Sequence, residues 1–497
     1  MSTNVEKKSG GLSKGRLGVF GIVFFVVAAS APMAGMTGTV PVAAVLGNGA
    51  AVPGAFVFVG IVLLLFSVGF TAMSHKVTNA GAFFAYVGKA LGVNMGVASS
   101  FVSSLAYMTV QFCIYGFFGA IMSGTFASLG LDLPWYVWFL VGWALVTLLS
   151  LMRVDVGAKF LGVLTSLEVL SMLIVAIAIL ANGGPEGLNF AASFDPTLVF
   201  AGGFAGTAGI AISFAFASFI GFESTAIYGE EAKDAKNTVR KATYWAVGII
   251  AGLFAVVTFA MMTALGSSDV ITPILERSDG LANPANVLFS LASEYVGPWM
   301  AVVMNILIVT SLFAGLLAFQ NAGSRYFFAM SRGGVLPSAL SRTNGRGAPA
   351  GGVWTMSVLA LIVVGLFAVF QLDPILNLFY WLSAVAVLAI TLVEILVSIS
   401  VIVYFMKNEG ANVWQGKIAP ALATIGMVLA LYLIVARFNL LAGTVADGVD
   451  PTLPESAFAL NPLGWFLVAL PVIFFVAGLI TAVVNKKENS SLVSDMS

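Results

Sequence analysis

Long runs of apolar residues alternate along the chain with short segments of polar and charged residues. A helix needs about 20 apolar residues to cross a hydrocarbon layer that is about 30 Å thick, and each run approaches or exceeds this length. The runs lack the period-two alternation of a transmembrane β-barrel. We therefore expect an all-α integral membrane protein with twelve spans, at residues 18–47, 51–73, 95–127, 134–152, 159–181, 197–230, 239–265, 297–329, 352–371, 375–406, 418–437 and 463–485.

The positive charges are distributed unevenly among the connecting segments. With the N-terminus placed in the cytoplasm, all but two of the 22 lysines and arginines fall in cytoplasmic segments, and Arg277 and Arg437 fall outside. Cytoplasmic loops of membrane proteins carry such an excess of lysine and arginine. The sequence thus predicts a multi-pass protein of the plasma (inner) membrane, with cytoplasmic tails at residues 1–17 and 486–497.

Composition narrows the classes of function. The chain is 60% hydrophobic and 9% charged, and its formal net charge of zero gives no indication of nucleic-acid binding. It has one cysteine, Cys113, and one histidine, His75, so we expect neither an internal disulfide nor a metal site built from thiolates or imidazoles. No phosphate loop of the GxxxxGK type and no strand that could carry a nucleophile elbow are evident. We therefore expect no metal, no cofactor and no enzymatic activity.

Two of the predicted spans contain residues that break helices. The first span reads VVAASAPMAGMTGTVPVAAVLG, in which Pro32, Gly35, Gly38 and Pro41 follow one another closely. Proline removes a backbone donor, and glycine permits unwinding. The sixth span carries Gly202, Gly203, Gly206, Gly209 and Gly221. Helices rich in glycine can also pack closely without any break, and this is the alternative interpretation.

Interrupted spans at corresponding positions are typical of transporters built from inverted repeats, in which the substrate binds between two broken helices. We expect such repeats at about residues 18–181 and 197–406, followed by two helices within residues 407–485. Free N–H groups where a half-helix begins attract a carboxylate, and free C=O groups where one ends attract an ammonium group. An α-amino acid carries both groups and is the first substrate class to consider.

Three carboxyl groups, those of Glu168, Glu223 and Glu394, lie inside predicted spans. A charged carboxylate at the centre of a bilayer costs about 2.5–3.5 kcal/mol, so each needs a partner, a water-filled cavity or a proton. Glu168 follows Lys159 by about nine residues, close to the middle of its span, and is the best candidate for a group that takes up a proton. Glu223 suits a gate or a structural hydrogen bond as well as direct contact with the substrate, whereas Glu394 can also be an acid that reaches water from a helix end.

Four motifs resemble the amino acid–polyamine–organocation superfamily of transporters. They are NAGAFFAYVGKALG (Asn79–Gly92), SFIGFES, GEEAKDAKNTVRKA and NAGSRYFFAMSRGGVLP (Asn321–Pro337), and the resemblance covers about residues 18–406. It implies the LeuT-type fold, a 5+5 inverted repeat with broken helices 1 and 6. Two residues depart from the family pattern: Gly333 follows Arg332 where an acid is common, and Ala235 stands where a proline is common.

The resemblance also implies which backbone groups hold the substrate. In the family, amides of the first break meet the substrate carboxylate, and carbonyls of the sixth-helix break meet the amino group. By position, these residues are Ala34, Gly35, Met36 and Thr37 in the first break and Ala217, Ser218, Ile220 and Gly221 in the second. Relatives that recognise bulky cations often have an aromatic residue at the position of Ala217, so its absence weakens the expectation of an arginine- or agmatine-type specificity.

Further residues are candidates for gating and coupling. Phe219, Phe222 and Glu223 are candidate gates, and plain packing is the alternative for the two aromatic residues. In the stretch VTSLFAG, Thr310 and Ser311 occupy a segment that resembles the surroundings of the sodium site in sodium-coupled relatives. They can bond an ion or a carboxyl group, or simply a neighbouring helix.

A lysine fills the sodium position on the fifth helix of several proton-coupled relatives, and Glu168 stands at the corresponding place here. We therefore hypothesise that Glu168 is the proton-coupling residue. Tyr107 and Gln111 share one helix face and either line the site or bond a neighbouring helix. Members of the charged cluster that begins at Glu230 can pair with Arg325 or Arg332 to close the inner side.

The leading function hypothesis is secondary active import of an amino acid by proton symport with alternating access. The alternatives are an amino acid/amine exchanger, a polyamine or ethanolamine permease, and a sodium-coupled amino acid symporter. A non-transporting sensor would usually carry an appended signalling domain, and no segment of the sequence indicates one. The expected partners are therefore a small-molecule substrate, protons and the lipid bilayer, and the sequence leaves the oligomeric state open.

Overall fold

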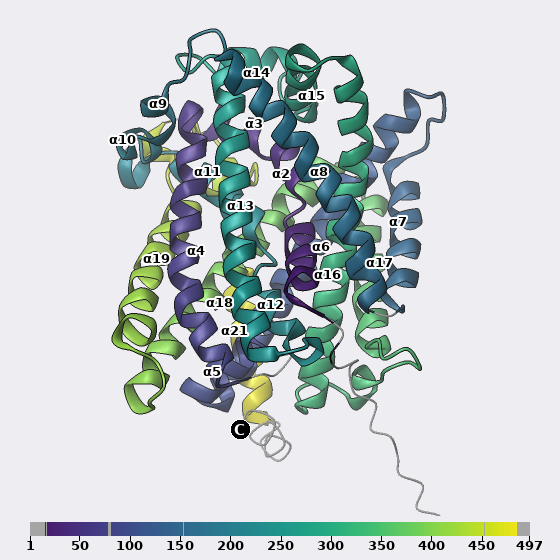
Figure 1. The fold of residues 1–497 in the computed structure, drawn as a ribbon, viewed down its shortest axis with the longest axis vertical. Coiled ribbons are helices and arrows are strands. Elements are labelled where there is room, and N and C mark those ends of the chain that lie inside the picture. Colours follow the sequence, from purple (N-terminus) through teal and green to yellow (C-terminus); the bar gives the residue numbers. More distant parts are fainter. Residues whose placement is uncertain (1–14, 16, 78–80, 153, 452, 485–497) are drawn as a thin grey trace, which may run out of the picture.

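The computed structural model describes residues 15, 17–77, 81–152, 154–451 and 453–484, and within this range the regular secondary structure is helical apart from two isolated β-bridges (Figure 1). Most of the two predicted tails lies outside the described residues. The principal helices are α1 (Val19–Ala29), α2 (Pro32–Gly38), α4 (Val52–Ser74), α5 (Phe83–Leu91), α6 (Val93–Ala127), α7 (Trp135–Ser150), α8 (Val154–Asn182), α11 (Ala208–Phe219), α12 (Ser224–Ile227), α13 (Ala235–Leu265), α16 (Pro298–Arg332), α17 (Ala350–Val369), α18 (Tyr380–Lys407), α19 (Ala419–Ala436) and α21 (Pro462–Val484).

Short helices connect or extend these elements. They are α3 (Val40–Val42), η1 (Ala43–Asn48), η2 (Gly49–Ala51), α9 (Phe190–Phe194), α10 (Pro196–Val199), η3 (Gly203–Ala205), η4 (Tyr228–Glu231), α14 (Ile271–Arg277), α15 (Ala285–Tyr295), η5 (Ser338–Ser341), η6 (Pro374–Phe379), η7 (Trp414–Ile418), α20 (Phe438–Leu441) and η8 (Pro454–Ser456). The connection near residues 266–296 thus contains two short helices, α14 and α15.

Eleven segments of the described chain are helical, long and apolar enough to cross a membrane. The remaining predicted span, 134–152, corresponds to α7, an apolar helix of 16 residues. At about 1.5 Å per residue this helix is about 24 Å long, a little shorter than the hydrocarbon layer. The all-α membrane class is confirmed, and a count of twelve crossings stays a prediction.

The sixth predicted span begins later in the structure than expected. Residues 197–207 form the end of α10, a turn and η3, and the long helix α11 begins only at Ala208. Gly202 and Gly203 have φ angles of 76° and 58°, a conformation that a right-handed helix does not contain. Gly202 and Gly203 therefore lie where η3 begins, before the long helix, instead of within a span.

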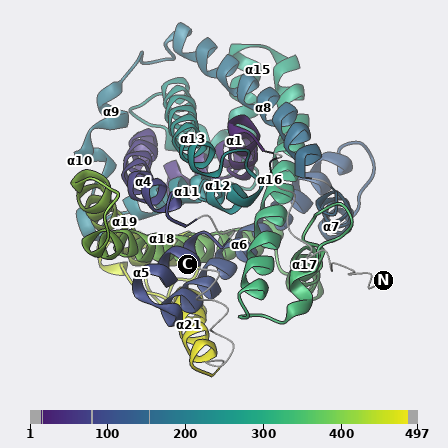
Figure 2. The same ribbon diagram turned by 60° about the horizontal axis from the view of Figure 1, so that its bottom comes forward.

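The interrupted helices occupy the centre of the molecule. In the most apolar 18 residues of each segment, 94% of the residues are buried in Ala208–Glu231 and 78% in Val19–Gly38, whereas only 22% are buried in the C-terminal helix α21. Figure 2 shows α1, α11 and α12 enclosed by the other long helices. The two helix breaks are therefore enclosed by other helices, as the absence of water in a bilayer requires.

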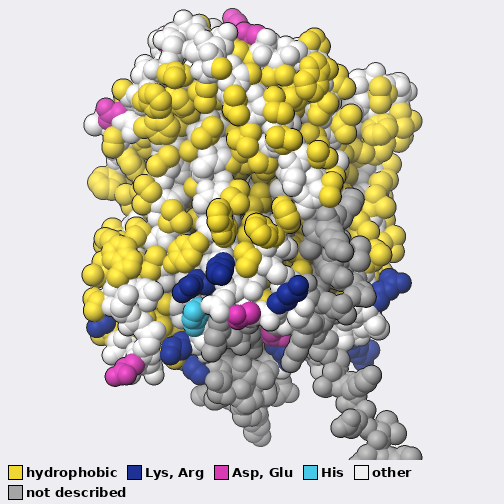
Figure 3. Space-filling model, viewed as in Figure 1, with side chains coloured by type: hydrophobic (Ala, Val, Ile, Leu, Met, Phe, Trp, Pro, Cys, Tyr) yellow, Lys and Arg dark blue, Asp and Glu magenta, His cyan; other side chains and the backbone are white. Residues whose placement is uncertain are grey.

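The outer surface has the character of a membrane protein. Large apolar side chains are exposed on α7, α8, α16, α17 and α21. Figure 3 shows apolar side chains over most of the visible face, with Lys and Arg side chains gathered toward its lower end. We call this lower end the basic face; it carries the ends of α4 and α18 and the start of α13 (Figure 1).

Close packing of α17 against α16 gives a test of the fold. A Cβ atom at Gly352 of α17 would collide with the backbone oxygen of Ser324 in α16, whereas Gly365 of the same helix faces open space. We expect Gly352→Ala to lower the free energy of unfolding by about 1–3 kcal/mol because the helices must move apart. Gly365→Ala should leave stability unchanged or raise it by up to about 1 kcal/mol.

Thermal unfolding of the purified variants in detergent measures the difference between these two changes. Equal unfolding temperatures for the two variants would contradict the observed contact between α16 and α17.

Candidate functional site

The first helix break lies between α1 and α2. Ala31 has φ 39° and ψ 64°, a left-handed conformation, and Pro32 is the first residue of α2. Proline disfavours the α conformation in the residue before it, and its own missing N–H is harmless at the start of a helix. The break is thus three residues earlier than Ala34, and Gly35 and Gly38 remain helical.

The start of α2 is held by the carboxyl group of Glu168 from α8. Glu168 is 1% exposed, and its Oε1 atom accepts hydrogen bonds from the N–H of Met33 (2.5 Å) and from Oγ of Ser311 on α16 (2.6 Å). A negative group at the start of a helix is also favoured by the helix dipole. One side chain therefore joins α2, α8 and α16 at the break.

The second break lies between α11 and α12. Ile220 is extended, and Gly221 has a φ angle of 109°. The N–H of Gly221 donates to Oε2 of Glu223 (2.9 Å), while Oε1 of Glu223 accepts a hydrogen bond from the hydroxyl of Tyr107 on α6 (2.8 Å). Glu223 is 1% exposed, so a buried glutamate stabilises the second break as well.

The two breaks lie against each other. A Cβ atom at Gly221 would lie 2.6 Å from Cβ of Ala29, so only glycine allows this approach, and its φ angle independently favours glycine. A Cβ atom at Gly35 would lie 3.5 Å from Oγ of Ser218. The start of α2 and the end of α11 consequently face a common space.

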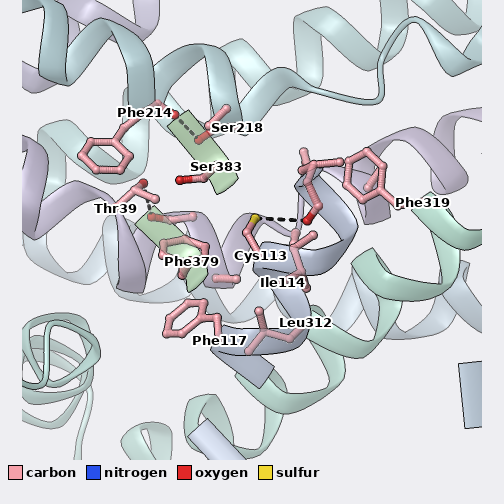
Figure 4. A pocket seen from close by; sticks show the side chains of 17 residues that line it. Thr39, Cys113, Ile114, Phe117, Phe214, Ser218, Leu312, Phe319, Phe379 and Ser383 are labelled. Carbon is pink, nitrogen blue, oxygen red and sulfur yellow. Dashed lines mark hydrogen bonds between the residues drawn. The ribbon is translucent and has the colours of Figure 1, made fainter. Parts of the chain in front are cut away.

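A cavity of about 60 Å³ occupies this space, enough for a few water molecules. Its lining residues come from both breaks and from α6, α16 and α18 with its preceding turn: Ala29, Ser30, Ala31, Ala34, Gly35, Thr39, Val110, Cys113, Ile114, Phe117, Phe214, Ala217, Ser218, Leu312, Phe319, Phe379 and Ser383. None of these lining residues carries a charged side chain. Figure 4 shows Thr39, Ser218 and Ser383 grouped on one side of the cavity.

The hydroxyl groups in this wall are oriented by their own helices. Oγ1 of Thr39 donates to the carbonyl of Gly35 (2.7 Å), Oγ of Ser218 to Phe214 (2.9 Å) and Oγ of Ser383 to Tyr380 (3.2 Å). Each hydroxyl has one proton, so the remaining lone pairs make these oxygens acceptors toward the cavity. This side of the cavity suits a donor such as an ammonium group.

Aromatic rings cover the cavity on the side away from the basic face. The ring centroids of Phe117 and Phe379 lie 4.9 Å apart, those of Phe379 and Tyr380 lie 5.3 Å apart, and those of Tyr380 and Phe214 lie 6.2 Å apart. The ring of Phe117 also packs against Gly38 of α2, where a Cβ atom would lie 2.7 Å away. We call these four residues the aromatic lid.

Ion pairs close the side toward the basic face. Arg325 of α16 donates to both carboxylate oxygens of Glu231 (2.5 and 3.1 Å), and the two side chains are 2% and 0% exposed. Tyr228 lies under the guanidinium group of Arg325, 5.0 Å from its ring centroid, and stacks on Phe25 of α1. Nearby, Arg332 pairs with Glu230, as the sequence had suggested for this charged cluster.

The chain before α1 joins the same closure. The N–H of Leu17 donates to the carbonyl of Glu231 (3.0 Å), and the carbonyl of Leu17 accepts from the N–H of Lys233 (2.9 Å). We call the two ion pairs and this backbone pairing the basic-face closure. The structure is therefore closed around the cavity from both sides.

The sequence-predicted binding residues fall into two groups. Ala34, Gly35, Ala217 and Ser218 line the cavity. The other four, Met36, Thr37, Ile220 and Gly221, are buried next to the breaks and are not among its lining residues.

The candidate gating and coupling residues are also placed by the structure. Phe222 packs edge-on against Phe66 of α4, and Phe219 is buried beside Gly60. Ser311 bonds Glu168, whereas Oγ1 of Thr310 donates to the carbonyl of Leu307 in its own helix. Thr310 lines a separate hollow near α15.

Sequence reasoning missed most of the cavity wall on α6 and α18. Val110, Cys113, Ile114 and Phe117 line the cavity at helical spacing on one face of α6. Tyr107 and Gln111 belong to the same helix and bond other helices instead: Tyr107 bonds Glu223, and Gln111 bonds Gln320 of α16. The sequence shows that residues three or four positions apart share a face of α6, but it does not show which face points into the cavity.

Glu394 differs from the expectation that an acid might reach water at a helix end. It lies near the middle of α18, it is 2% exposed, and its Oε2 atom has no hydrogen-bond partner in the structure. The hydroxyl groups of Thr391 and Ser398 on the same helix face are likewise buried without partners. Glu394 is thus a carboxyl group inside the protein, separate from the cavity wall.

Comparison with known proteins agrees with this architecture. A sequence model of a family described as amino acid permease matches residues 17–468. The branched-chain amino acid permease of Lactococcus lactis is 28% identical over 322 residues, which cover 61% of this chain and 65% of the relative. The histidine permease of Saccharomyces cerevisiae is 26% identical over 264 residues, covering 50% of this chain and 42% of the relative. The chain therefore matches less than two thirds of the length of these relatives.

A solved structure shares the fold. The manganese transporter of Eremococcus coleocola, in complex with an aromatic bis-isothiourea substituted compound, superposes with a TM-score of 0.58 at 13% identity. The superposition covers 96% of this chain and 98% of that one. At this identity the likeness concerns the arrangement of helices alone.

The buried ion pair gives a test of the closure. Arg325→Met should lower the free energy of unfolding by about 3–5 kcal/mol, because it leaves the Glu231 carboxylate buried without its partner. The double variant Arg325→Met/Glu231→Met should recover much of this loss, since no isolated charge remains. Thermal unfolding of the single and double variants measures both effects, and a double variant as unstable as the single one would contradict them.

Proposed function

The chain belongs to the amino acid permease family, and on this premise we propose that it imports a neutral amino acid across the plasma membrane by proton symport. The observation that carries this proposal is the closed cavity between two broken helices, with the start of one half-helix and the end of another in its wall. A single small molecule in the cavity would thus meet the positive end of the α2 dipole and the negative end of the α11 dipole.

The start of α2 is the proposed site for the substrate carboxylate. The N–H of Met33 is engaged by Glu168 and that of Gly35 donates to Ala31 (2.9 Å). Among the described residues, no backbone oxygen outside α2 accepts a hydrogen bond from the N–H of Ala34, and Ala34 lines the cavity. Backbone donors at a helix start form a ready site for an anion.

The end of α11 is the proposed site for the substrate ammonium group. The last carbonyls of a helix lack intrahelical partners, and the dipole makes this end partly negative. The acceptor oxygens of Thr39, Ser218 and Ser383 lie on the same side of the cavity. An α-amino acid would satisfy both ends at once.

The remaining wall supports a substrate with a neutral, apolar side chain. Val110, Ile114, Leu312 and Phe319 lie there, and the cavity wall contains no carboxylate to meet a second positive charge. The branched-chain specificity named for one relative fits this wall. A polyamine, ethanolamine or arginine-type amine would leave a charge unpaired in the cavity, which is costly.

Alternating access would open one closure at a time. The aromatic lid is held by ring packing, and the basic-face closure is held by buried ion pairs and by the backbone of Leu17. We propose that the basic face is cytoplasmic, because lysine and arginine are enriched there. The aromatic lid is then the outer gate, and both termini are cytoplasmic.

Glu168 is the proposed proton-coupling residue. An ionised carboxylate is the stronger acceptor for the N–H of Met33 and the hydroxyl of Ser311, so proton uptake would loosen the link between α2, α8 and α16. This link lies at the first break, within a few residues of the cavity wall. Protonation could thereby change how easily α2 moves when substrate is bound.

Sodium symport is the alternative that the experiment must separate. The hydroxyls of Thr310 and Ser311 donate to Leu307 and to Glu168. Each hydroxyl has only one proton, so both oxygens keep lone pairs that a sodium ion could use, and the choice between the two ions rests on the gradient experiment. Amino acid/amine exchange is the second alternative and needs no ion gradient.

The proposed binding of the substrate carboxylate at α2 and of its ammonium group at α11 predicts which ligands bind. Leucine, isoleucine or valine should raise the unfolding temperature of the purified protein, since a ligand that binds the native state stabilises it. Isopentylamine and 4-methylpentanoate, which are leucine without its carboxylate and without its ammonium group, should give no shift at the same concentration. A shift with arginine but not with leucine would overturn the proposed substrate class.

Proton coupling through Glu168 predicts that a substitution there abolishes proton-driven accumulation but not substrate exchange. In proteoliposomes, Glu168→Gln should lose accumulation driven by a pH gradient and keep exchange of internal for external substrate. Glu394→Gln is the matched control, because it removes a second buried carboxyl group that lies outside the cavity wall. Accumulation that needs a sodium gradient alone, or a Glu168→Gln protein that still accumulates substrate with unchanged pH dependence, would contradict proton coupling through Glu168.

A further inference from the structure

A polar pocket lies at the basic face, between α4, α13 and η7 and away from the central cavity. Its volume is about 540 Å³, far larger than the central cavity. It is lined by Thr71, Ala72, His75, Arg240, Lys241, Tyr244, Trp245, Gly410 and Gln415. The pocket shares no lining residue with the central cavity, and the proposed transport cycle does not use it.

The wall of the pocket is positively charged. Arg240 and Lys241 stand next to each other on α13, His75 follows α4, and the ammonium group of Lys76 lies against Gly410. None of the nine lining residues is a carboxylate, and neither Arg240 nor Lys241 forms an ion pair with a residue that the structure describes. Figure 3 shows His beside Lys and Arg on this part of the surface. The pocket therefore suits an anionic group.

Aromatic side chains place the pocket at the depth of the lipid headgroups. Tyr244 and Trp245 of α13 are 37% and 61% exposed, and Trp414 of η7 is 46% exposed. Tyrosine and tryptophan gather at the boundary between membrane and water because one end of each ring system is polar. An anion in the pocket would thus lie where phospholipid phosphates lie.

A smooth apolar strip continues from the pocket along α13. Gly248 and Gly252 are exposed with open space at their Cβ positions, and Val256 is 41% exposed. These residues follow Trp245 on one helix face, and the strip is about 16 Å long at about 1.5 Å per residue. Because glycine has no side chain, the helix surface at Gly248 and Gly252 leaves room for an extended hydrocarbon chain.

We propose that this pocket binds an anionic phospholipid, with the phosphate between Arg240, Lys241 and His75 and one acyl chain along Gly248 and Gly252. The charge and the strip lie on one helix in the order that a phospholipid requires, headgroup first and chain toward the membrane centre. A free phosphate ion would use only the charged part. The lipid would connect α13 with the segment between α18 and α19, where Gly410 and Gln415 lie.

Native mass spectrometry of the purified full chain, titrated with phosphatidylglycerol or phosphatidylcholine, tests this proposal. We expect preferential retention of one phosphatidylglycerol molecule. Arg240→Gln/Lys241→Gln should weaken that retention about 10- to 30-fold, since each cation near a membrane surface contributes about 1 kcal/mol toward an anionic lipid. The matched control is Arg342→Gln/Lys407→Gln, which removes two exposed cations outside the pocket and should retain the lipid.

Two further arms separate a lipid from a soluble anion. Gly248→Leu/Gly252→Leu fills the strip and should weaken phosphatidylglycerol retention while leaving the charged wall intact. Inorganic phosphate at millimolar concentration should not displace the lipid. Equal retention of the two lipids, equal losses in the pocket and control variants, or full displacement by phosphate would each overturn the proposal. The lipid-free unfolding temperatures identify any variant that fails to fold.

Discussion

A hydrocarbon layer offers no hydrogen-bond partners, and this constraint governs where the chain can leave the helical state. Both interruptions, at Ala31 and at Gly221, lie at the centre of the bundle and against each other. Their freed N–H groups are met by glutamates, Met33 by Glu168 and Gly221 by Glu223. A buried carboxyl group is costly in a membrane protein, but here it replaces the helical partner that the backbone has lost.

The same constraint explains why the cavity is small, uncharged and enclosed. Its polar groups are backbone atoms and hydroxyls whose protons are already bonded within their own helices. The nearest carboxyl groups lie outside the cavity wall, that of Glu168 at the start of α2 and that of Glu223 at the start of α12. In the proposed cycle, a zwitterionic substrate would supply the two charges that the cavity wall lacks. A proton on Glu168 would weaken the hydrogen bond between Glu168 and the start of α2.

Much of the fold could be predicted from the sequence because hydrophobic length and proline and glycine placement act locally. Pro32 and Gly221 marked both breaks, and the eleven long apolar helices fall within the predicted spans or extend them. The register of the first break was misjudged, because the sequence does not show that Pro32 begins a half-helix and that Gly35 and Gly38 stay helical. The cavity wall on α6 depends on helix rotation, and so Phe117 and Cys113 were missed while Tyr107 and Gln111 were named. Glu394 shows the same limit, since its burial depends on neighbours that are distant in sequence.

The pairing of Leu17 with Glu231 and Lys233 has a mechanical consequence. These two backbone bonds attach Leu17, just before α1, to the turn that carries the Glu231–Arg325 pair. Loss of this pairing would release the turn that carries the ion pair without altering a residue that lines the cavity. In the proposed cycle, a change confined to Leu17 would therefore alter how often the basic face opens, while the wall of the cavity stayed the same.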